Sequence, residues 1–192
     1  MNTIHDYITG IQQIGIGVAD AQEAMHTYKQ LFGMKVLIFD DVAEAKLMTH
    51  YTGNKIYKRR AILTLNMTGG AGFEIWQFLN RTPLASKTKI KYGDLGIFAP
   101  KIKCRDINAA FQNYNRQNNQ IELCKDDDGA TYFWVNDKYG NHYQLVEALD
   151  YYDENKQPTG GVSGAVIGVR DMQLSIDFYG SVLGDYELVY DR

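Results

Sequence analysis

The sequence predicts an α+β fold built from paired βαβββ modules, with two complete modules followed by a partial third. The main observation is a repeat with an offset of 151 residues, which aligns Asp20, Tyr28, Gly33 and Asp40 with Asp171, Tyr179, Gly184 and Asp191. A weaker copy lies between them, with Asp106, Tyr114 and Asn119 at the corresponding positions. In addition, a strand pattern and a hairpin pattern follow each of the first two helical segments.

The first repeat reads as strand, helix, strand. Residues 15–18 alternate small and apolar side chains, which is typical of a half-buried strand. Asp20 stands where a helix N-cap belongs, and Glu23 completes a capping-box pattern. Apolar residues then recur at helical spacing up to Gly33, whose left-handed conformation would end the helix. Residues 34–40 have the pattern of a second strand.

A hairpin completes the first module, which we place at residues 8–80. The stretch 41–60 is less regular and carries a basic cluster of Lys55, Lys58, Arg59 and Arg60. Residues 61–67 and 73–79 read as two strands joined by the glycine-rich turn at 68–72. That turn lacks the Gly-Lys-Ser/Thr ending of a phosphate loop, so the hairpin interpretation is favoured.

The second module, at residues 94–149, repeats this order. A strand at 95–104 contains Pro100, which indicates an edge or a bulge. A helix at 106–118 and a strand at 120–124 follow, and a hairpin joins 130–135 to 142–149. The acidic run at 126–129 lacks the alternating ligands and distal glutamate of a calcium loop, so it is interpreted as a turn.

Residues 150–161 are polar, contain Pro158 and a glycine pair, and are predicted to be a linker. Residues 162–192 then give strand, helix and strand, without the last two strands of a module. Such a unit cannot bury its helix alone. We therefore expect either further C-terminal modules in a longer protein or a homodimer in which this segment completes the partner's sheet.

Composition excludes several classes of protein. Among 192 residues, 45% are hydrophobic and 22% are charged, as in ordinary soluble globular proteins. The net charge of −3 gives no reason to expect a nucleic acid or a membrane as partner. The N-terminus has no signal-peptide pattern. Two cysteines, Cys104 and Cys124, are too few for a disulfide framework, and we expect buried free thiols in a reducing cytoplasm.

These features resemble the vicinal-oxygen-chelate superfamily, which includes glyoxalase I, extradiol dioxygenases and bleomycin-resistance proteins. The resemblance rests on the strand-then-Asp starts IGIGVAD and VIGVRD, on helices ending in LFG or VLG, and on D-x-x-G-N-x-x-Q-L at 137–145. It covers most of the chain. It implies two modules whose sheets curl around a shared cleft for a small organic ligand, and it leaves the reaction unassigned.

The resemblance also implies a divalent metal in the cleft, with ligands from the first and last strands of each module. The corresponding first-strand residues are Gln13, Ala99 and Gly164, and the last-strand residues are Glu74 and Gln144. None is histidine. Zinc and iron prefer imidazole or thiolate, so we expect no tightly bound metal and at most weak divalent binding by Gln13, Glu74 and Gln144. The alternative is that these three form a hydrogen-bonded polar patch.

Aromatic residues give the clearest indication of a ligand. Trp76, Trp134 and His142 are predicted to face the cleft, since His142 shares its strand face with Gln144. The alternatives are rings that fill the core and a histidine on the hairpin surface.

Three functions remain open. One is a metal-free binding module. Another is an enzyme, either a glyoxalase-like lyase or isomerase or an extradiol-type dioxygenase, with its metal site in modules beyond residue 192. The third is a scaffold whose paired modules only dimerise. If the present residues catalyse a reaction, Glu74 is the predicted catalytic base, because it is the one carboxylate expected at a cleft position.

Overall fold

The computed structural model describes residues 8, 10–84, 86–117, 121–154, 157–184 and 186–189. Its strands are β1 (Gln13–Gly17), β2 (Val36–Glu44), β3 (Lys58–Leu65), β4 (Gly72–Phe78), β5 (Gly96–Cys104), β6 (Leu123–Lys125), β7 (Thr131–Asn136), β8 (His142–Glu147) and β9 (Thr159–Gly168). Its helices are α1 (Ala21–Phe32), α2 (Ile107–Gln117) and α3 (Met172–Leu183), with a 3₁₀ helix η2 at Lys46–Tyr51. Asn119 and Asp191 of the repeat lie outside the described residues.

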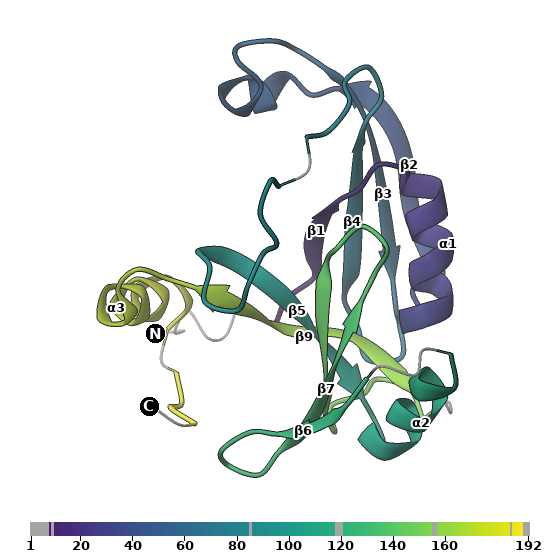
Figure 1. Ribbon diagram of the computed structural model, residues 1–192, viewed down its shortest axis with the longest axis vertical. Helices are drawn as coiled ribbons and strands as arrows, with labels where there is room; N and C mark the ends of the chain where they lie inside the picture. The colour runs from purple at the N-terminus through teal and green to yellow at the C-terminus, as the bar shows by residue number, and fades with distance from the viewer. Residues whose placement is uncertain are drawn as a thin grey trace.

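The strands form two mixed sheets, which confirms the predicted α+β architecture (Figure 1). Sheet A has the order β1-β4-β3-β2, and sheet B has the order β6-β7-β8-β5-β9. In each sheet the first strand of the module runs parallel to its last strand, β1 with β4 and β5 with β8. The two modules therefore have the same topology.

Helix α1 begins and ends where the sequence predicts. The Asp20 carboxylate accepts hydrogen bonds from the backbone N–H groups of Gln22 and Glu23, and Gly33 ends the helix at φ 66°. The capping box is only half formed, because the Glu23 carboxylate instead contacts Lys138 and Tyr139. Those two residues lie between β7 and β8, so Glu23 links α1 to the second module.

One hydrophobic core joins both modules. Tyr28 and Phe32 of α1 are fully buried, and their rings contact Tyr143 of β8. The Phe32 ring also stacks with Tyr114 of α2. Helices α1 and α2 therefore pack into one shared core, and in the part of the chain that the structure describes no α-helix lies on the opposite faces of the two sheets (Figure 1).

Strand β2 is longer than predicted, because it continues to Glu44 and pairs with the first residues of β3. The basic cluster that we interpreted as part of an irregular segment is therefore partly in a strand. Arg59 pairs with Asp41, and Arg60 pairs with Asp40, across the two strands. These ion pairs explain why a strongly charged stretch forms strands here.

The predicted linker is wrong in its last residues, because β9 begins at Thr159. The glycine pair that indicated a linker instead allows two backbones to approach closely. A Cβ atom on Gly69 would lie 2.1 Å from the carbonyl oxygen of Gly160, and one on Gly161 would lie 1.9 Å from that of Gly70. Glycine is therefore required at this contact between β9 and the β3–β4 turn.

The partial third module does not form a sheet of its own. Strand β9 pairs antiparallel with β5 at the edge of sheet B, and α3 projects away from both sheets (Figure 1). No residue of α3 is buried, and Leu174 and Phe178 are 67% and 60% exposed. Residues 186–189 are not a strand, which corrects the predicted third strand of this unit.

The two cysteines differ in environment. Cys104 at the end of β5 is fully buried, and burial raises the pKa of its thiol to about 12. Cys124 in β6 is only half-buried, which corrects the expectation that both thiols are buried. In the part of the chain that the structure describes, no helix has the length and apolar character needed to cross a membrane.

Candidate ligand pocket

The uncovered face of sheet B carries aromatic and polar side chains in cross-strand pairs. Strand alternation directs Phe133, Tyr143 and Leu145 toward the core, where all three are fully buried. The intervening residues point to the other face and pair across β7 and β8 as Tyr132 with Val146, Trp134 with Gln144, and Asn136 with His142. Lys101 of β5 lies beside Gln144 in the parallel register.

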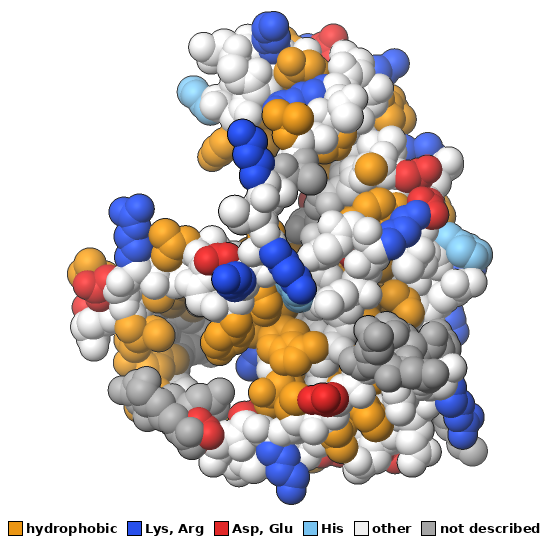
Figure 2. Space-filling view, in the orientation of Figure 1, with side chains coloured by type: hydrophobic (Ala, Val, Ile, Leu, Met, Phe, Trp, Pro, Cys, Tyr) orange, Lys and Arg blue, Asp and Glu red, His pale blue; other side chains and the backbone are white. Residues whose placement is uncertain are grey.

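These side chains line a pocket of about 400 Å³, called here the sheet-B pocket. Its lining is Tyr92, Phe98, Lys101, Asp126, Tyr132, Trp134, Asn136, His142, Gln144 and Val146. Figure 2 shows hydrophobic side chains gathered near the centre of this view, with basic groups beside them. The volume is within the range of sites that bind drug-sized organic molecules.

The aromatic rings of the pocket contact one another. Phe98 stacks on the His142 imidazole, with ring centroids 4.7 Å apart and planes at 19°. On its other sides Phe98 meets Trp134 and Tyr92 edge to face, at centroid distances of 5.6 and 5.7 Å. Such contacts hold the rings in place and present both flat faces and edges to a ligand.

His142 is oriented by a neighbour and is partly buried. Its Nδ1 atom lies 2.6 Å from the Oδ1 atom of Asn136, the residue opposite it on β7. Burial lowers the pKa of the imidazole, and Lys89 lowers it further. The ring is therefore mostly neutral near pH 7, so Nδ1–H donates to Asn136 and Nε2 is left as an acceptor.

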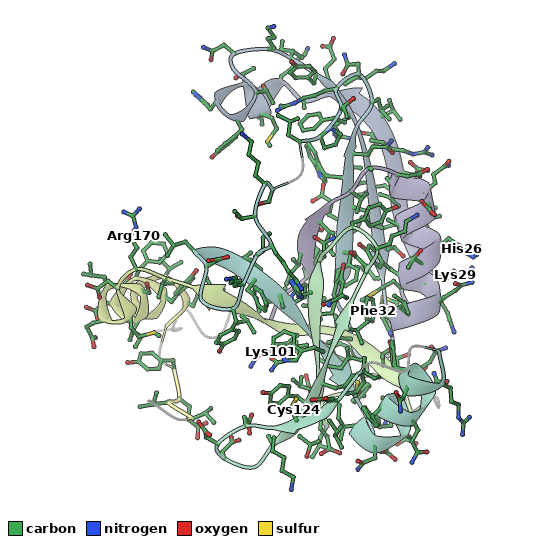
Figure 3. The ribbon with its side chains drawn as sticks, viewed as in Figure 1. His26, Lys29, Phe32, Lys101, Cys124 and Arg170 are labelled. Carbon is green, nitrogen blue, oxygen red and sulfur yellow. The ribbon has the colours of Figure 1, made fainter. Side chains whose placement is uncertain are left out.

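Two lining residues each have a side-chain oxygen that is closed off from solvent and has no hydrogen-bond partner among the described residues. These atoms are Oε1 of Gln144 and Oδ1 of Asp126. A hydrogen bond with Asp128 raises the pKa of Asp126, and Lys101 acts in the opposite direction. In Figure 3, Lys101 lies on the far side of β7 and β8 from Phe32, away from the core.

The structure brings together some of the predicted site residues and separates others. Gln13 and Glu74 meet on the uncovered face of sheet A, where Gln13 Nε2 donates to Glu74 Oε2 at 2.5 Å. Trp76 Nε1 donates to the other carboxylate oxygen at 2.8 Å. Gln144, Trp134 and His142 line the sheet-B pocket. Glu74 thus forms a hydrogen-bonded patch with two neighbours, and Gln144 lies elsewhere.

The donor set around Glu74 does not fit a tightly held zinc or iron ion. Glu74 contributes one carboxylate, whereas Gln13 directs its amide nitrogen toward it. Ala99 is fully buried and has no donor atom in its side chain. Within the described residues, no three His, Cys, Asp or Glu side chains are grouped as a metal site would require.

A second pocket of about 470 Å³ lies at the end of sheet A that faces the β7–β8 turn. Trp76, Phe78 and Tyr139 form its aromatic walls, and residues 82–84 close one side. Arg59 lies over the Trp76 ring at 5.3 Å. The residues that line it include no charged side chain and no histidine, so it offers fewer groups that select a ligand than the sheet-B pocket does.

Comparison with solved structures identifies the fold. A glyoxalase family protein from Bacillus cereus superposes with a TM-score of 0.56 at 15% identity, over 74% of this chain and 95% of that protein. The protein SMU.1112c gives a TM-score of 0.50 at 16% identity, over 73% of this chain and 99% of that one. The chain has the vicinal-oxygen-chelate fold. Comparison with protein-family models gives no match, and comparison with curated proteins gives none either.

Of the residues that line the sheet-B pocket, the sequence analysis singled out only Trp134, His142 and Gln144. Tyr92 and Phe98 come from the connection between modules and from β5, and Lys101 follows Pro100. Phe98 is adjacent to Ala99, the residue that the resemblance places in the cleft. Because neighbouring residues of a strand point to opposite faces, that expectation puts Phe98 on the face away from the cleft. Asp126 begins the acidic run that is interpreted as a turn because it lacks the ligand pattern of a calcium loop, and only the three-dimensional arrangement places it at the pocket.

Proposed function

We propose that this chain binds a small organic molecule in the sheet-B pocket and that binding requires no metal ion. The observation that carries this proposal is a pocket of about 400 Å³ that is lined by aromatic rings with polar side chains among them. A concave site of this volume, with a largely aromatic lining and a few polar groups, is typical of sites that bind small organic ligands.

The aromatic lining supports the same conclusion. Trp134, Phe98 and the neutral His142 ring offer a flat apolar surface, and Tyr132 lies at 6.1 Å from Trp134. A ligand with a planar ring would stack on one of these rings or meet their edges. The metal-free character of the proposal is supported by the donor set, since among the described residues no three His, Cys, Asp or Glu side chains are grouped around either pocket.

A catalytic role for Glu74 stays a prediction. Its carboxylate accepts hydrogen bonds at both oxygens, which fixes its orientation on sheet A. Replacement by glutamine tests the role directly, because Glu74→Gln keeps the shape and removes the basic oxygen. Loss of a detected turnover would support an enzymatic base, and unchanged turnover would exclude one.

The proposal is tested by screening planar aromatic compounds against the purified chain by calorimetry, before and after treatment with a chelator. We expect binding that the chelator does not change and that Trp134→Leu weakens about tenfold or more, since the ring is a pocket wall. Trp76→Leu is the matched control on sheet A and should leave the affinity unchanged.

Three results would overturn the proposal. Binding that disappears with the chelator and returns with zinc, iron or nickel would restore a metal-dependent lyase or dioxygenase. If Trp76→Leu abolishes binding and Trp134→Leu leaves it intact, the ligand binds in the pocket on sheet A instead. Absence of binding by the whole panel would remove the sheet-B pocket as a ligand site.

A further inference from the structure

Two residues of β8 present opposite hydrogen-bonding groups to the sheet-B pocket. His142 and Gln144 both line this pocket, and they are two residues apart in the strand. Strand alternation therefore places them on one face, about 7 Å from each other along the strand. Each side chain has one polar atom that is already hydrogen-bonded or closed off from solvent. The other polar atom of each side chain is the one that a ligand can reach.

His142 offers an acceptor to the pocket. Its Nδ1–H donates to Oδ1 of Asn136, which fixes the tautomer of the neutral ring and leaves the lone pair on Nε2. Nε2 forms no hydrogen bond with a described residue, and it is not among the atoms that are closed off from solvent. The stack on Phe98, with planes at 19°, holds the ring in this orientation. A ligand group that reaches Nε2 must therefore be a hydrogen-bond donor.

Gln144 offers a donor. The Oε1 atom of its amide is closed off from solvent and its Nε2 atom is not, so the N–H groups are the part of this amide that a ligand can reach. Within the described part of the chain, Nε2 forms no hydrogen bond. A ligand group that meets this side chain must therefore be an acceptor, such as a carbonyl oxygen.

The charged residues of the lining do not favour an ionic ligand. Lys101 and Asp126 bring one charge of each sign, and Lys101 lies beside Gln144 in the parallel register of β5 and β8. An anionic edge would gain from Lys101, but it would place an acceptor against the lone pair of His142, where it is repelled. A cationic edge would bring donors to His142 and no acceptor to Gln144. A neutral edge with one donor and one acceptor satisfies both residues.

We infer that the sheet-B pocket selects neutral planar aromatic ligands that carry a hydrogen-bond donor beside an acceptor on one ring edge, such as a cyclic aryl amide. This inference rests on the proposed function and specifies its ligand. The N–H group of the ligand donates to Nε2 of His142, and its carbonyl oxygen accepts from Nε2 of Gln144. The fused ring contacts Phe98 and Trp134, which meet edge to face beside them.

The experiment compares two probes with one ring system, 2-quinolone and 1-methyl-2-quinolone, by calorimetry on the intact chain. The methyl group removes the N–H donor and keeps the carbonyl oxygen. We expect 2-quinolone to bind about tenfold more tightly, which is the effect of one well-formed hydrogen bond. His142→Phe keeps an aromatic ring and removes the acceptor, so it should abolish this difference. Gln144→Met keeps the length and removes the donor, so it should weaken both probes about tenfold and preserve the difference.

His26→Phe is the matched control for the histidine substitution. His26 is exposed on α1, and Figure 3 shows it on the outer side of that helix, away from Lys101. The variant makes the same chemical change outside the pocket. It should leave both affinities and their ratio unchanged.

A preference for 2-quinolone that persists in His142→Phe would come from the bulk of the methyl group and would refute the contact with His142. Unchanged affinities in Gln144→Met would refute the contact with the carbonyl oxygen. Equal binding of both probes by the unaltered chain would refute the ligand class and leave the proposed function standing. A third probe, 2-naphthoate, tests the anionic alternative, and tighter binding of this anion than of 2-quinolone would show that Lys101 decides the class instead. If none of the three probes binds, the proposed function fails together with the ligand class.

Discussion

At the scale of single residues, Asp137 is the acceptor that holds the module interface together. Its Oδ2 atom accepts from the Tyr28 hydroxyl at 2.6 Å and from the Tyr143 hydroxyl at 2.9 Å. Its Oδ1 atom accepts from the backbone N–H groups of Tyr139 and Asn141. Burial and the contact with Asp137 raise the pKa of Tyr28, so the tyrosine stays protonated and keeps donating.

We expect Asp137→Asn to lower the free energy of unfolding by about 3 kcal/mol, because charge-assisted hydrogen bonds from two buried hydroxyls would face an amide. The measurement is urea unfolding followed by circular dichroism. Asp106→Asn is the control, since Asp106 caps α2 and asparagine caps a helix equally well. A loss below about 1 kcal/mol in Asp137→Asn would show that the hydroxyls find other partners.

Residue patterns in the sequence predicted local features and failed where distant residues meet. The caps at Asp20 and Gly33 follow from local chemistry, and the structure confirms both. The hydrogen-bond partners of Asp137 cannot be predicted from local chemistry, because Tyr28 lies 109 residues away in the sequence. The same limit applies to the site: alternation predicted that His142 and Gln144 share a face, but nothing local indicated that Asp126 and Phe98 would join them.

At the scale of elements, the repeat places one sequence pattern in two environments. Tyr28 in α1 and Tyr179 in α3 occupy the same repeat position, yet Tyr28 is fully buried and Tyr179 is 42% exposed. The cap is also different. Gly33 adopts the left-handed conformation, whereas Gly184 has φ 94° and ψ −164°. The pattern therefore specifies the helix, and the packing depends on what lies beside it.

This pair gives a matched test of how α3 is packed. Tyr28→Ala should lower the free energy of unfolding by about 3–5 kcal/mol, because it removes a fully buried ring. Tyr179→Ala should change it by less than about 0.5 kcal/mol, as for an exposed site. Both variants are compared by thermal and urea unfolding at several protein concentrations.

A large effect of Tyr179→Ala would contradict the exposed position of α3 and would indicate that a homodimer or a further module covers it in solution. That partnership was predicted from the sequence and stays a prediction. Dependence of the midpoint on protein concentration would favour the homodimer. A small effect that does not depend on protein concentration would show that α3 is exposed to solvent in solution, as it is in the structure.

At the scale of the whole molecule, buried polar contacts join the two modules in addition to the shared hydrophobic core. The Asn66 amide donates to the carbonyl oxygens of Phe32 and Thr159, which ties β3 to α1 and β9. The Lys103 ammonium on β5 donates to the carbonyl oxygen of Gly69, in the β3–β4 turn. Since the contacts of Asn66 with Thr159 and of Lys103 with Gly69 cross from one sheet to the other, separating the modules would leave these groups unpaired.

We therefore expect sheets A and B to unfold in one transition, and the two tryptophans allow a direct test. Trp76 reports on sheet A and Trp134 on sheet B, so Trp134→Phe and Trp76→Phe each leave one fluorescent reporter. Each reporter's midpoint in urea should coincide with the midpoint that circular dichroism gives for the same variant. Adding Phe32→Ala to each variant should lower the free energy of unfolding that each reporter gives by the same amount, about 3–5 kcal/mol. The reason is that the Phe32 ring contacts both Phe73 of sheet A and Tyr143 of sheet B. A shift confined to the Trp76 reporter would show that the first module unfolds alone, and the sheet-B pocket would then belong to an independently stable second module.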